Sequence, residues 1–217
     1  MKKIQSACAA IVVGALSLGT ACAETPGPVY AGIGISYAKV SDQLATTAEQ
    51  MMSTAGGTFS LDMKTSAASG RIFAGYNVHE QVALELGFLK TQNMRSNFTG
   101  TESHQISFSG SGTRKLSGID YSVLLRPSQE SGMHRFYGRL GGSYLQDDRS
   151  ATVHAGTHSS YSVRASEKGT GWLAGIGYEH PVSSNLSIRA EYSHYGRIAG
   201  DSDTRAGMYG INLIGRF

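Results

Sequence analysis

The sequence predicts an all-β fold, namely an eight-stranded antiparallel up-and-down transmembrane β-barrel with short periplasmic turns and longer extracellular loops. Three observations predict it: a signal-like amino terminus, eight segments in which apolar residues alternate with small or polar ones, and an aromatic residue at the carboxyl end. Successive side chains of a strand point to opposite faces of a sheet. Alternation over about ten residues therefore indicates a strand long enough to cross a bilayer.

The amino-terminal residues have the features of a secretory signal peptide. A short basic start and an apolar run over residues 9–18 precede Ala21 and Ala23, which form a small-x-small cleavage site. The apolar run is too short for a transmembrane helix, which needs about 20 residues. We therefore expect a signal peptide over residues 1–23 and an outer-membrane β-barrel domain over residues 24–217.

The composition that remains after cleavage argues against several kinds of chemistry. Both cysteines, Cys8 and Cys22, lie in the expected signal peptide, so we expect neither a disulfide nor thiol chemistry in the barrel. Removing Lys2 and Lys3 from the 19 basic residues leaves 17 against 16 acidic ones, a net charge of +1. This balance does not suggest a nucleic-acid partner. We also expect no cofactor.

Eight segments show the alternation, in chain order. They are residues 29–40, 70–78, 81–89, 116–125, 136–145, 171–179, 186–195 and 209–217. Their apolar faces are Val29, Ile33, Ile35 and Tyr37; Ile72, Ala74, Tyr76 and Val78; Val82, Leu84, Leu86 and Phe88; Ile119, Tyr121, Val123 and Leu125; Phe136, Leu140 and Tyr144; Trp172, Ala174, Ile176 and Tyr178; Leu186, Ile188, Ala190 and Tyr192; and Tyr209, Ile211, Leu213 and Phe217. Single-chain bacterial outer-membrane barrels have an even number of strands. Every backbone polar group in hydrocarbon must be paired within the protein, so we expect the sheet to close.

The last segment has the character of an assembly signal. Tyr209, Ile211, Leu213 and Phe217 share one face, and Phe217 is the last residue of the sequence. A terminal aromatic side chain is an unusual choice in water but fits a face that meets lipid. We therefore expect the barrel-assembly machinery to be a partner of this end of the chain.

The connections between these segments alternate in length. Three are short or moderate, and four are longer and rich in Ser, Thr, Gly and Asn. The short ones are 77–80, 126–135 and 181–185, and the long ones are 41–69, 92–115, 147–170 and 196–206. Bacterial barrels place short turns in the periplasm and long loops outside. We therefore expect both termini in the periplasm of a Gram-negative bacterium, with outer-membrane lipid and lipopolysaccharide around the barrel.

Several charged residues fall on the inward face of the expected strands. They are Arg71, Glu85, Asp120, Arg139, Glu179, Arg189 and Glu191. An ion path or a proton relay is one interpretation. However, an eight-stranded barrel has an interior that its own side chains can fill, and buried charges of both signs should pair. We interpret the set as a salt-bridged plug, in which the glycines at 34, 75, 87, 175 and 177 make room for long Arg and Tyr side chains.

Aromatic residues recur on the outward face. They are Tyr37, Tyr76, Phe88, Tyr121, Tyr144, Trp172, Tyr178, Tyr192 and Phe217. A ligand cage is one interpretation, but aromatic girdles at the two membrane interfaces explain a set that is spread over all strands.

The long loops contain the candidate interaction residues, which are His104, Phe108, His154, His158 and Tyr161. Residues 104–109 and 161–165 look like strand continuations, so we expect a projecting sheet whose edge can pair with a strand of a partner. The alternative is that these are hydrated loops that shield the membrane surface. His154 and His158 have a metal-binding spacing for a helix, but four residues along a strand span roughly 13 Å. We therefore expect no metal site.

One resemblance raises the question of catalysis. Lipid A deacylases of the PagL type are similar eight-stranded barrels, in which a His activates a Ser for attack on an ester. Here Ser193 precedes His194 and so points to the opposite face, and Gly196 stands where that family's nucleophile is expected. We therefore expect His194 to be an interfacial residue and the protein not to be an enzyme.

Two strand–turn–strand segments carry a broader resemblance. R-I-F-A-G-Y-N-V-H-E-Q-V-A-L-E-L-G-F at 71–88 resembles the signature of OmpA-like and opacity-type small barrels, and G-I-G-Y-E-H-P-V-S-S-N-L-S-I-R-A-E-Y at 175–192 repeats it. In size and loop layout the chain is closer to the OmpX/Ail/opacity class than to full-length OmpA, and Vibrio-type accessory colonisation factors are another similar set. We expect no carboxy-terminal peptidoglycan-binding domain of the OmpA kind.

The resemblance implies adhesins, invasins or serum-resistance factors, so the first hypothesis is adhesion or colonisation through the extracellular loops, with host-cell or matrix proteins as partners. A structural barrel without a dedicated ligand is the second hypothesis. A lipid A-modifying enzyme is the third.

Overall fold

The computed structural model describes residues 27–41, 58–101, 107–155 and 159–217. Its strands and 3₁₀ helices are β1 (Val29–Ser41), β2 (Thr58–Met63), β3 (Ser66–His79), β4 (Val82–Thr91), β5 (Met94–Thr101), β6 (Ser107–Leu125), η1 (Gln129–Ser131), β7 (Phe136–Ala155), β8 (Ser159–Pro181), β9 (Leu186–Gly196), η2 (Ile198–Gly200) and β10 (Arg205–Arg216). Within these residues, no helix is long and apolar enough to cross a membrane. The expected signal peptide, residues 1–23, lies outside the described part.

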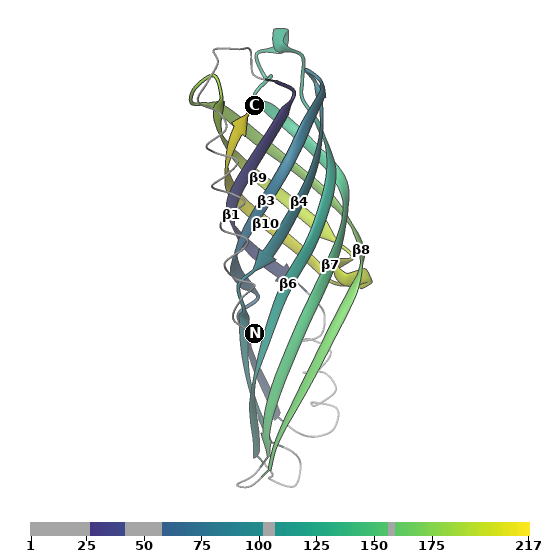
Figure 1. Ribbon diagram of the computed structural model, residues 1–217. Helices are drawn as coiled ribbons and strands as arrows, with labels where there is room; N and C mark the ends of the chain where they lie inside the picture. The colour runs from purple at the N-terminus through teal and green to yellow at the C-terminus, as the bar shows by residue number, and fades with distance from the viewer. Residues whose placement is uncertain (1–26, 42–57, 102–106, 156–158) are drawn as a thin grey trace, which may run out of the picture.

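Eight of the strands close into an antiparallel barrel (Figure 1). Their order is β1, β3, β4, β6, β7, β8, β9 and β10, and β10 pairs again with β1. In the closing pair, Tyr30 lies opposite Arg216 and Ser41 lies opposite Arg205. Closure leaves no open sheet edge in the hydrocarbon, so the backbone groups there are paired. The predicted fold class is confirmed.

The two faces of the wall have the composition that the alternation predicts. In β4, Glu85 and Leu89 are 4% and 1% exposed, whereas Leu86 and Phe88 are 59% and 42% exposed. The other barrel strands follow the same rule, with apolar side chains outward. A water-soluble protein would bury these side chains, but a surface that meets lipid gains by exposing them.

Three strands continue far past the others at one end (Figure 1). β6 and β7 pair without interruption from Phe108 opposite Ala155 to Leu125 opposite Gly138, and β8 accompanies β7 along its whole length. Two further strands, β5 and β2, pair in turn beside the extended part of β6. We refer to this extension, in the order β2-β5-β6-β7-β8, as the projecting sheet.

The prediction of loops over 92–115 and 147–170 is wrong for most of these residues, because the described parts of both segments are largely β-strand. Serine, threonine and glycine are common in loops, but they also suit solvated strands that are held by their neighbours. The segment 161–165, predicted as a strand continuation, does lie within β8, and residues 107–109 lie in β6.

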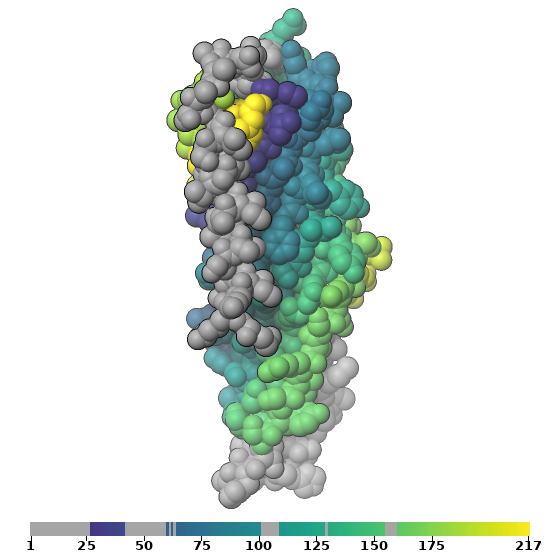
Figure 2. All heavy atoms as spheres, viewed as in Figure 1, coloured from purple at the N-terminus to yellow at the C-terminus, as the bar shows by residue number. Residues whose placement is uncertain are grey.

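The molecule has two distinct ends. The short turns β3–β4, β6–β7 and β8–β9 and the carboxyl terminus lie at one end, and the projecting sheet extends from the other (Figure 1). The far part of β8 clearly passes the turn between β9 and β10 in the space-filling view (Figure 2). By the bacterial pattern of short periplasmic turns, the projecting sheet is extracellular.

Side chains fill the barrel in layers. Along β4, β6 and β7 the charged residues Glu85, Asp120 and Arg139 lie between members of two apolar clusters. The cluster near the short turns is Tyr30, Phe73, Ala83, Leu124, Tyr137 and Ile214. The cluster toward the projecting sheet is Ala38, Val40, Leu89, Met94, Leu116, Leu145, Leu173, Tyr195, Ile198, Ala206 and Met208. The charged layer is therefore covered by apolar side chains on both sides.

Candidate functional site

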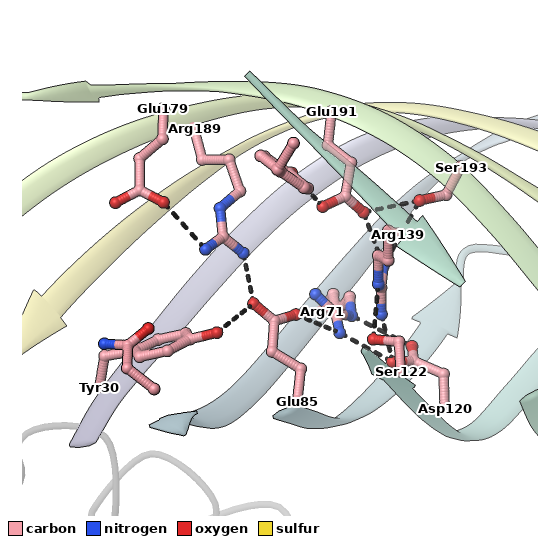
Figure 3. A network of polar contacts seen from close by, with 12 residues as sticks. Tyr30, Arg71, Glu85, Asp120, Ser122, Arg139, Glu179, Arg189, Glu191 and Ser193 are labelled. Carbon is pink, nitrogen blue, oxygen red and sulfur yellow. Dashed lines mark hydrogen bonds and ion pairs between the residues drawn. The ribbon is translucent and has the colours of Figure 1, made fainter. Parts of the chain in front are cut away.

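All seven inward charged residues of the sequence analysis lie in one network in the middle of the barrel (Figure 3). They come from six strands: Arg71 from β3, Glu85 from β4, Asp120 from β6, Arg139 from β7, Glu179 from β8, and Arg189 and Glu191 from β9, whose alternation sends both inward. The register of the antiparallel strands places these seven residues at about the same height in the barrel, so residues distant in sequence meet across the interior.

Asp120 is shared by two arginines. Arg71 donates from Nη2 to Asp120 Oδ1 at 2.7 Å and from Nε to Oδ2 at 3.1 Å. Arg139 donates from Nη2 to the same Oδ1 at 2.6 Å, and from Nη1 to Glu191 Oε1 at 2.6 Å. Asp120 and Arg139 are fully buried, so each charge depends on these partners.

A second branch of the network runs toward the periplasmic end. Arg189 forms ion pairs with Glu85 and with Glu179 Oε2, the latter at 3.1 Å. Glu179 also pairs with Arg126 and Arg216, which lie near the short turns. One carboxylate thus links the buried layer to the basic residues at the barrel mouth.

Two tyrosines complete the network. Tyr30 Oη donates to Glu85 Oε1 at 3.0 Å, and Tyr137 Oη donates to Glu191 Oε2 at 2.5 Å. Both rings lie over glycines of the neighbouring strand. A Cβ at Gly75 would lie 2.1 Å from Tyr30 Cζ, and one at Gly177 would lie 2.2 Å from Tyr137 Oη. Glycine at these positions makes room for the rings, as the sequence predicts.

The arrangement can hold charge but leaves little room for an ion path. The carboxylates of Glu85, Asp120 and Glu191 face three guanidinium groups, so the centre is balanced in charge. Apolar side chains close both sides of it. The geometry therefore favours the plug over a conducting pore.

The outward aromatic residues form two rows. Toward the projecting sheet, Tyr37 lies opposite Tyr209, and Tyr209 lies opposite Tyr192 with ring centroids 4.6 Å apart. Near the short turns, Phe136 contacts Tyr178 edge-on at 5.0 Å. Between the rows the outward positions carry no charge. Aromatic rows that bound an apolar band are typical of the two membrane interfaces.

The histidine considered for catalysis lies on this outer surface. His194 stacks against Trp172 with ring centroids 5.2 Å apart. Ser193 points inward, where its hydroxyl donates to Glu191 Oε1 at 2.6 Å and accepts from Arg139. The two side chains lie on opposite sides of the wall and do not form a nucleophile–base pair.

The projecting sheet has two chemically different faces. Its outer face carries hydroxyl pairs, such as Thr113 with Ser150 at 2.7 Å. Its inner face continues the inward face of the barrel and carries small and apolar residues, which are Ser96, Phe98, Gly110, Gly112, Ala151, Val153, Tyr161 and Val163. Of these, Tyr161 is 71% exposed.

Among the described residues, β8 forms an open edge of the projecting sheet. β9 pairs with β8 only from Trp172 onward, opposite Gly196. The η2 turn covers the next residues, since a Cβ at Gly169 would lie 2.5 Å from the Ala199 carbonyl carbon. From Ser159 to Lys168, β8 therefore has one strand neighbour among the described residues, which is β7.

The candidate interaction residues are distributed along the projecting sheet. His154 is exposed in β7 and lies opposite Ser160, Tyr161 lies in β8, and the backbone of Phe108 pairs in β6. His104 and His158 lie outside the described residues. In the part of the chain that the structure describes, no three His, Cys, Asp or Glu side chains are placed to hold a metal ion.

One polar cluster at the base of the projecting sheet was not predicted. Arg114 Nη2 donates to Asp147 Oδ2 at 2.6 Å, and Arg149 Nη2 donates to the same oxygen at 2.7 Å. These residues fell in or beside segments predicted as loops. The sequence does contain a signal for this cluster. Arg114 lies two residues from the inward Leu116, and Asp147 lies two residues from the inward Leu145, so both should point inward if the strands continue.

The chain was compared with known proteins. Residues 8–217 match the family model described as outer membrane protein beta-barrel domain. Among solved structures, Ail, the attachment invasion locus protein of Yersinia pestis, is 16% identical with a TM-score of 0.50, over 88% of this chain and 99% of that chain. Neisserial surface protein A is 18% identical with a TM-score of 0.40, over 89% and 100%. OprG from Pseudomonas aeruginosa is 10% identical with a TM-score of 0.42, over 87% and 96%.

A search of curated protein sequences gives no significant match. At identities this low, the likeness to Ail concerns the fold alone.

Proposed function

The chain belongs to the outer membrane protein β-barrel domain family, and from this we propose that it is a surface protein that binds host-cell or matrix proteins through its projecting sheet. In this proposal the barrel is the scaffold in the Gram-negative outer membrane. Adhesion or colonisation is the process that it serves.

The observation that carries the proposal is the open edge of β8. From Ser159 to Lys168 the edge has ten residues, which is roughly 33 Å at about 3.3 Å per residue. Unpaired N–H and C=O groups along such an edge can form main-chain hydrogen bonds with an added strand. A partner strand docked there would extend the sheet by one strand.

The side chains of the edge determine which face of a partner strand should be apolar and which should be polar. Tyr161 and Val163 lie on the inner face, whereas Ser160, Ser162 and Arg164 lie on the outer face. A matching strand would place apolar residues beside Tyr161 and Val163 and polar residues on the other side. This alternation is the kind of specificity that strand addition allows.

Two bacterial partners belong to the same proposal. The terminal strand, with Tyr209, Ile211, Leu213 and Phe217 on its outer face, is the segment that the barrel-assembly machinery would recognise. Lipopolysaccharide would surround the barrel at the level of the aromatic row that lies toward the projecting sheet.

The experiment is surface display in a non-adherent laboratory strain, with binding to epithelial cells and matrix proteins as the measurement. In one variant, Arg149 and Ala165, which lie opposite each other, are joined by an Asn-Gly turn, which removes six of the ten edge residues, 159–164, and with them Tyr161 and Val163. In a matched variant, Ser96 and Gly112 are joined in the same way, which shortens the β5–β6 hairpin and leaves β8 intact.

We expect wild-type cells to bind and the variant that lacks most of the β8 edge to lose binding. The matched variant should lose less, because β8 still projects. Heat-modifiable migration of all three proteins from outer membranes would establish that the barrels are folded. Equal, negligible binding by all three would contradict the proposal.

That outcome would favour a second candidate, a structural barrel without a dedicated ligand. The observation behind it is that the interior network and the aromatic rows satisfy the needs of a membrane barrel without any partner.

A further inference from the structure

A basic hollow lies on the outer wall of the barrel just beyond the apolar band. Its volume is about 740 Å³, and it is lined by Gly70, Lys90, Thr91, Gln92, Asn93, Arg95 and Lys115. The residues come from β3, β4, β5 and β6 and from the short join between β4 and β5. The wall formed by β3, β4 and β6 faces the viewer in Figure 1.

The sheet register brings the three cations together. Lys90 lies between Gly70 of β3 and Ser117 of β6, and Lys115 is two residues from Ser117 on the same face. Arg95 lies opposite Thr113, the other outward neighbour of Lys115. Three positive side chains thus surround one depression.

The floor of the hollow is open because it contains a glycine. A Cβ built at Gly70 meets no atom within 4 Å. Any larger side chain at this position would reach into the space between the cations.

Two acidic groups lie near these cations among the residues that the structure describes, namely Asp148 and Asp62. The ion pairs of the described residues leave out Lys90, Arg95 and Lys115. Asp148 of β7 lies directly opposite Lys115 of β6, and its Oδ1 accepts hydrogen bonds from Gln146 and from Ser166 of β8, both at 2.7 Å. Asp62 is on β2, one strand beyond Arg95. Three cations against these two carboxylates leave the hollow with a net positive charge for an anion.

The distance of the hollow from the apolar band indicates which kind of anion it would meet. Phe88 is the last apolar residue on the outer face of β4, and Lys90 follows two residues later. Two residues are about 7 Å along the strand, or about 5 Å along the membrane normal for a strand tilted by about 40°. Groups at that height meet lipid head groups, and basic pockets there suit anionic ones.

We propose that this hollow binds a phosphate group of lipopolysaccharide. It lies on the same side of the apolar band as the projecting sheet, which is the side of the outer leaflet. Lys90, Arg95 and Lys115 would donate charge-assisted hydrogen bonds to the phosphate oxygens. Gln92 and Asn93 would donate from their side-chain amides to the adjoining sugar. The inference rests on the outer-membrane placement in the proposed function and not on the binding of a host protein.

The test measures binding of fluorescent lipopolysaccharide to the protein purified from outer membranes in detergent. One variant combines Lys90→Gln, Arg95→Gln and Lys115→Gln. A charge-matched control combines Lys39→Gln, Lys168→Gln and Arg205→Gln, which are exposed cations on β1, β8 and β10.

A third variant, Gly70→Leu, keeps every charge and fills the hollow. Heat-modifiable migration on gels would establish that each variant is folded.

The hollow variant should bind lipopolysaccharide about tenfold or more weakly, because each charge-assisted hydrogen bond is worth more than a neutral one. Gly70→Leu should also weaken binding, and the charge-matched control should change it less than about threefold. Equal losses in the hollow and control variants would overturn the site in favour of diffuse attraction to a basic surface.

Competitors distinguish the possible sources of phosphate. We expect unlabelled lipopolysaccharide to displace the probe, and dephosphorylated lipopolysaccharide to displace it poorly. Equal displacement by dephosphorylated lipopolysaccharide would show that phosphate is not the ligand. Equal displacement by phosphatidylglycerol or by inorganic phosphate would show a general anion site, and the assignment to lipopolysaccharide would be wrong. Loss of host-cell adhesion leaves all of these readouts unchanged, so the two proposals can fail separately.

Discussion

At the scale of single residues, buried charge and buried space decide what each position tolerates. Asp120 is fully buried and accepts hydrogen bonds from Arg71, Arg139 and the hydroxyl of Tyr195. A buried charge without its partner is costly because it has lost water and gained nothing in return. Gly75 and Gly177 matter for a different reason. Because they have no side chain, the rings of Tyr30 and Tyr137 can occupy the space beside them.

Replacing Asp120 by Ala should lower the free energy of unfolding by about 3–5 kcal/mol, because two arginines would lose a buried counter-charge. Urea unfolding in lipid vesicles, followed by tryptophan fluorescence, measures it. Asp203→Asn is the control, since Asp203 is exposed in the β9–β10 turn and should change stability by less than about 0.5 kcal/mol. An unchanged midpoint for Asp120→Ala would refute the importance of the network for stability.

Replacing Gly75 by Ala should destabilise the barrel by about 1–3 kcal/mol, because the new Cβ would overlap the Tyr30 ring. Gly138→Ala is a matched control in another barrel strand, since a Cβ there meets no atom within 4 Å. The same unfolding assay compares the two. Similar effects of both substitutions would mean that backbone flexibility, and not the Tyr30 contact, explains the glycine.

At the scale of elements, the turn between β9 and β10 closes the extracellular side of the barrel. Ile198 is 1% exposed and belongs to the apolar cluster toward the projecting sheet. The turn that follows is held by Asp201, whose carboxylate accepts from the hydroxyl of Thr204 at 2.6 Å and from the backbone N–H of Asp203 at 3.0 Å. These hydrogen bonds, aided by Arg149 and Arg114, lower the pKa of Asp201.

The lowered pKa of Asp201 predicts how the turn depends on pH. A carboxylate with a lowered pKa stabilises the turn at pH values above its unfolded pKa, near 3.9, and the effect is lost as the pH falls through the lower folded value. In an NMR titration, the amide resonance of Asp203 should therefore shift with a midpoint below about 3.9. Asp201→Asn should abolish this titration. A midpoint at or above the ordinary value would contradict the hydrogen-bonded turn.

At the scale of the whole molecule, a lipid-facing band surrounds a sealed interior and carries a solvated sheet. Along β10 and the residue after it, the band runs from Tyr209 to Phe217, a rise of eight residue steps or roughly 20 Å along the normal for a strand tilted by about 40°, close to the apolar band of about 25 Å in such barrels. Inside it, charges pair and apolar clusters lie on both sides.

The sealed interior predicts that the protein does not conduct ions steadily. In planar lipid bilayers the purified barrel should give no discrete openings in molar potassium chloride, because an eight-stranded barrel is filled by its own side chains. A porin inserted under the same conditions is the positive control. Regular openings that scale with protein concentration would contradict the plug.

Local sequence patterns are enough to predict the wall of the barrel and the charged residues inside it. Alternation in segments such as 81–89 predicts which side chains meet lipid, and it places Glu85 and Asp120 inside, because the period of two is a local property of the strand. The same reasoning set Ser193 and His194 on opposite faces.

The length of the strands and the contacts between their side chains depend on tertiary structure. Ser, Thr and Gly in 107–115 and 147–155 suit loops and solvated strands alike, so pairing with neighbouring strands had to choose between them. Likewise, the register between strands brings Asp120 into contact with Arg71 and Arg139 and places Lys90, Arg95 and Lys115 around one hollow. Register is a relation between distant segments, and no local pattern in one of them contains it.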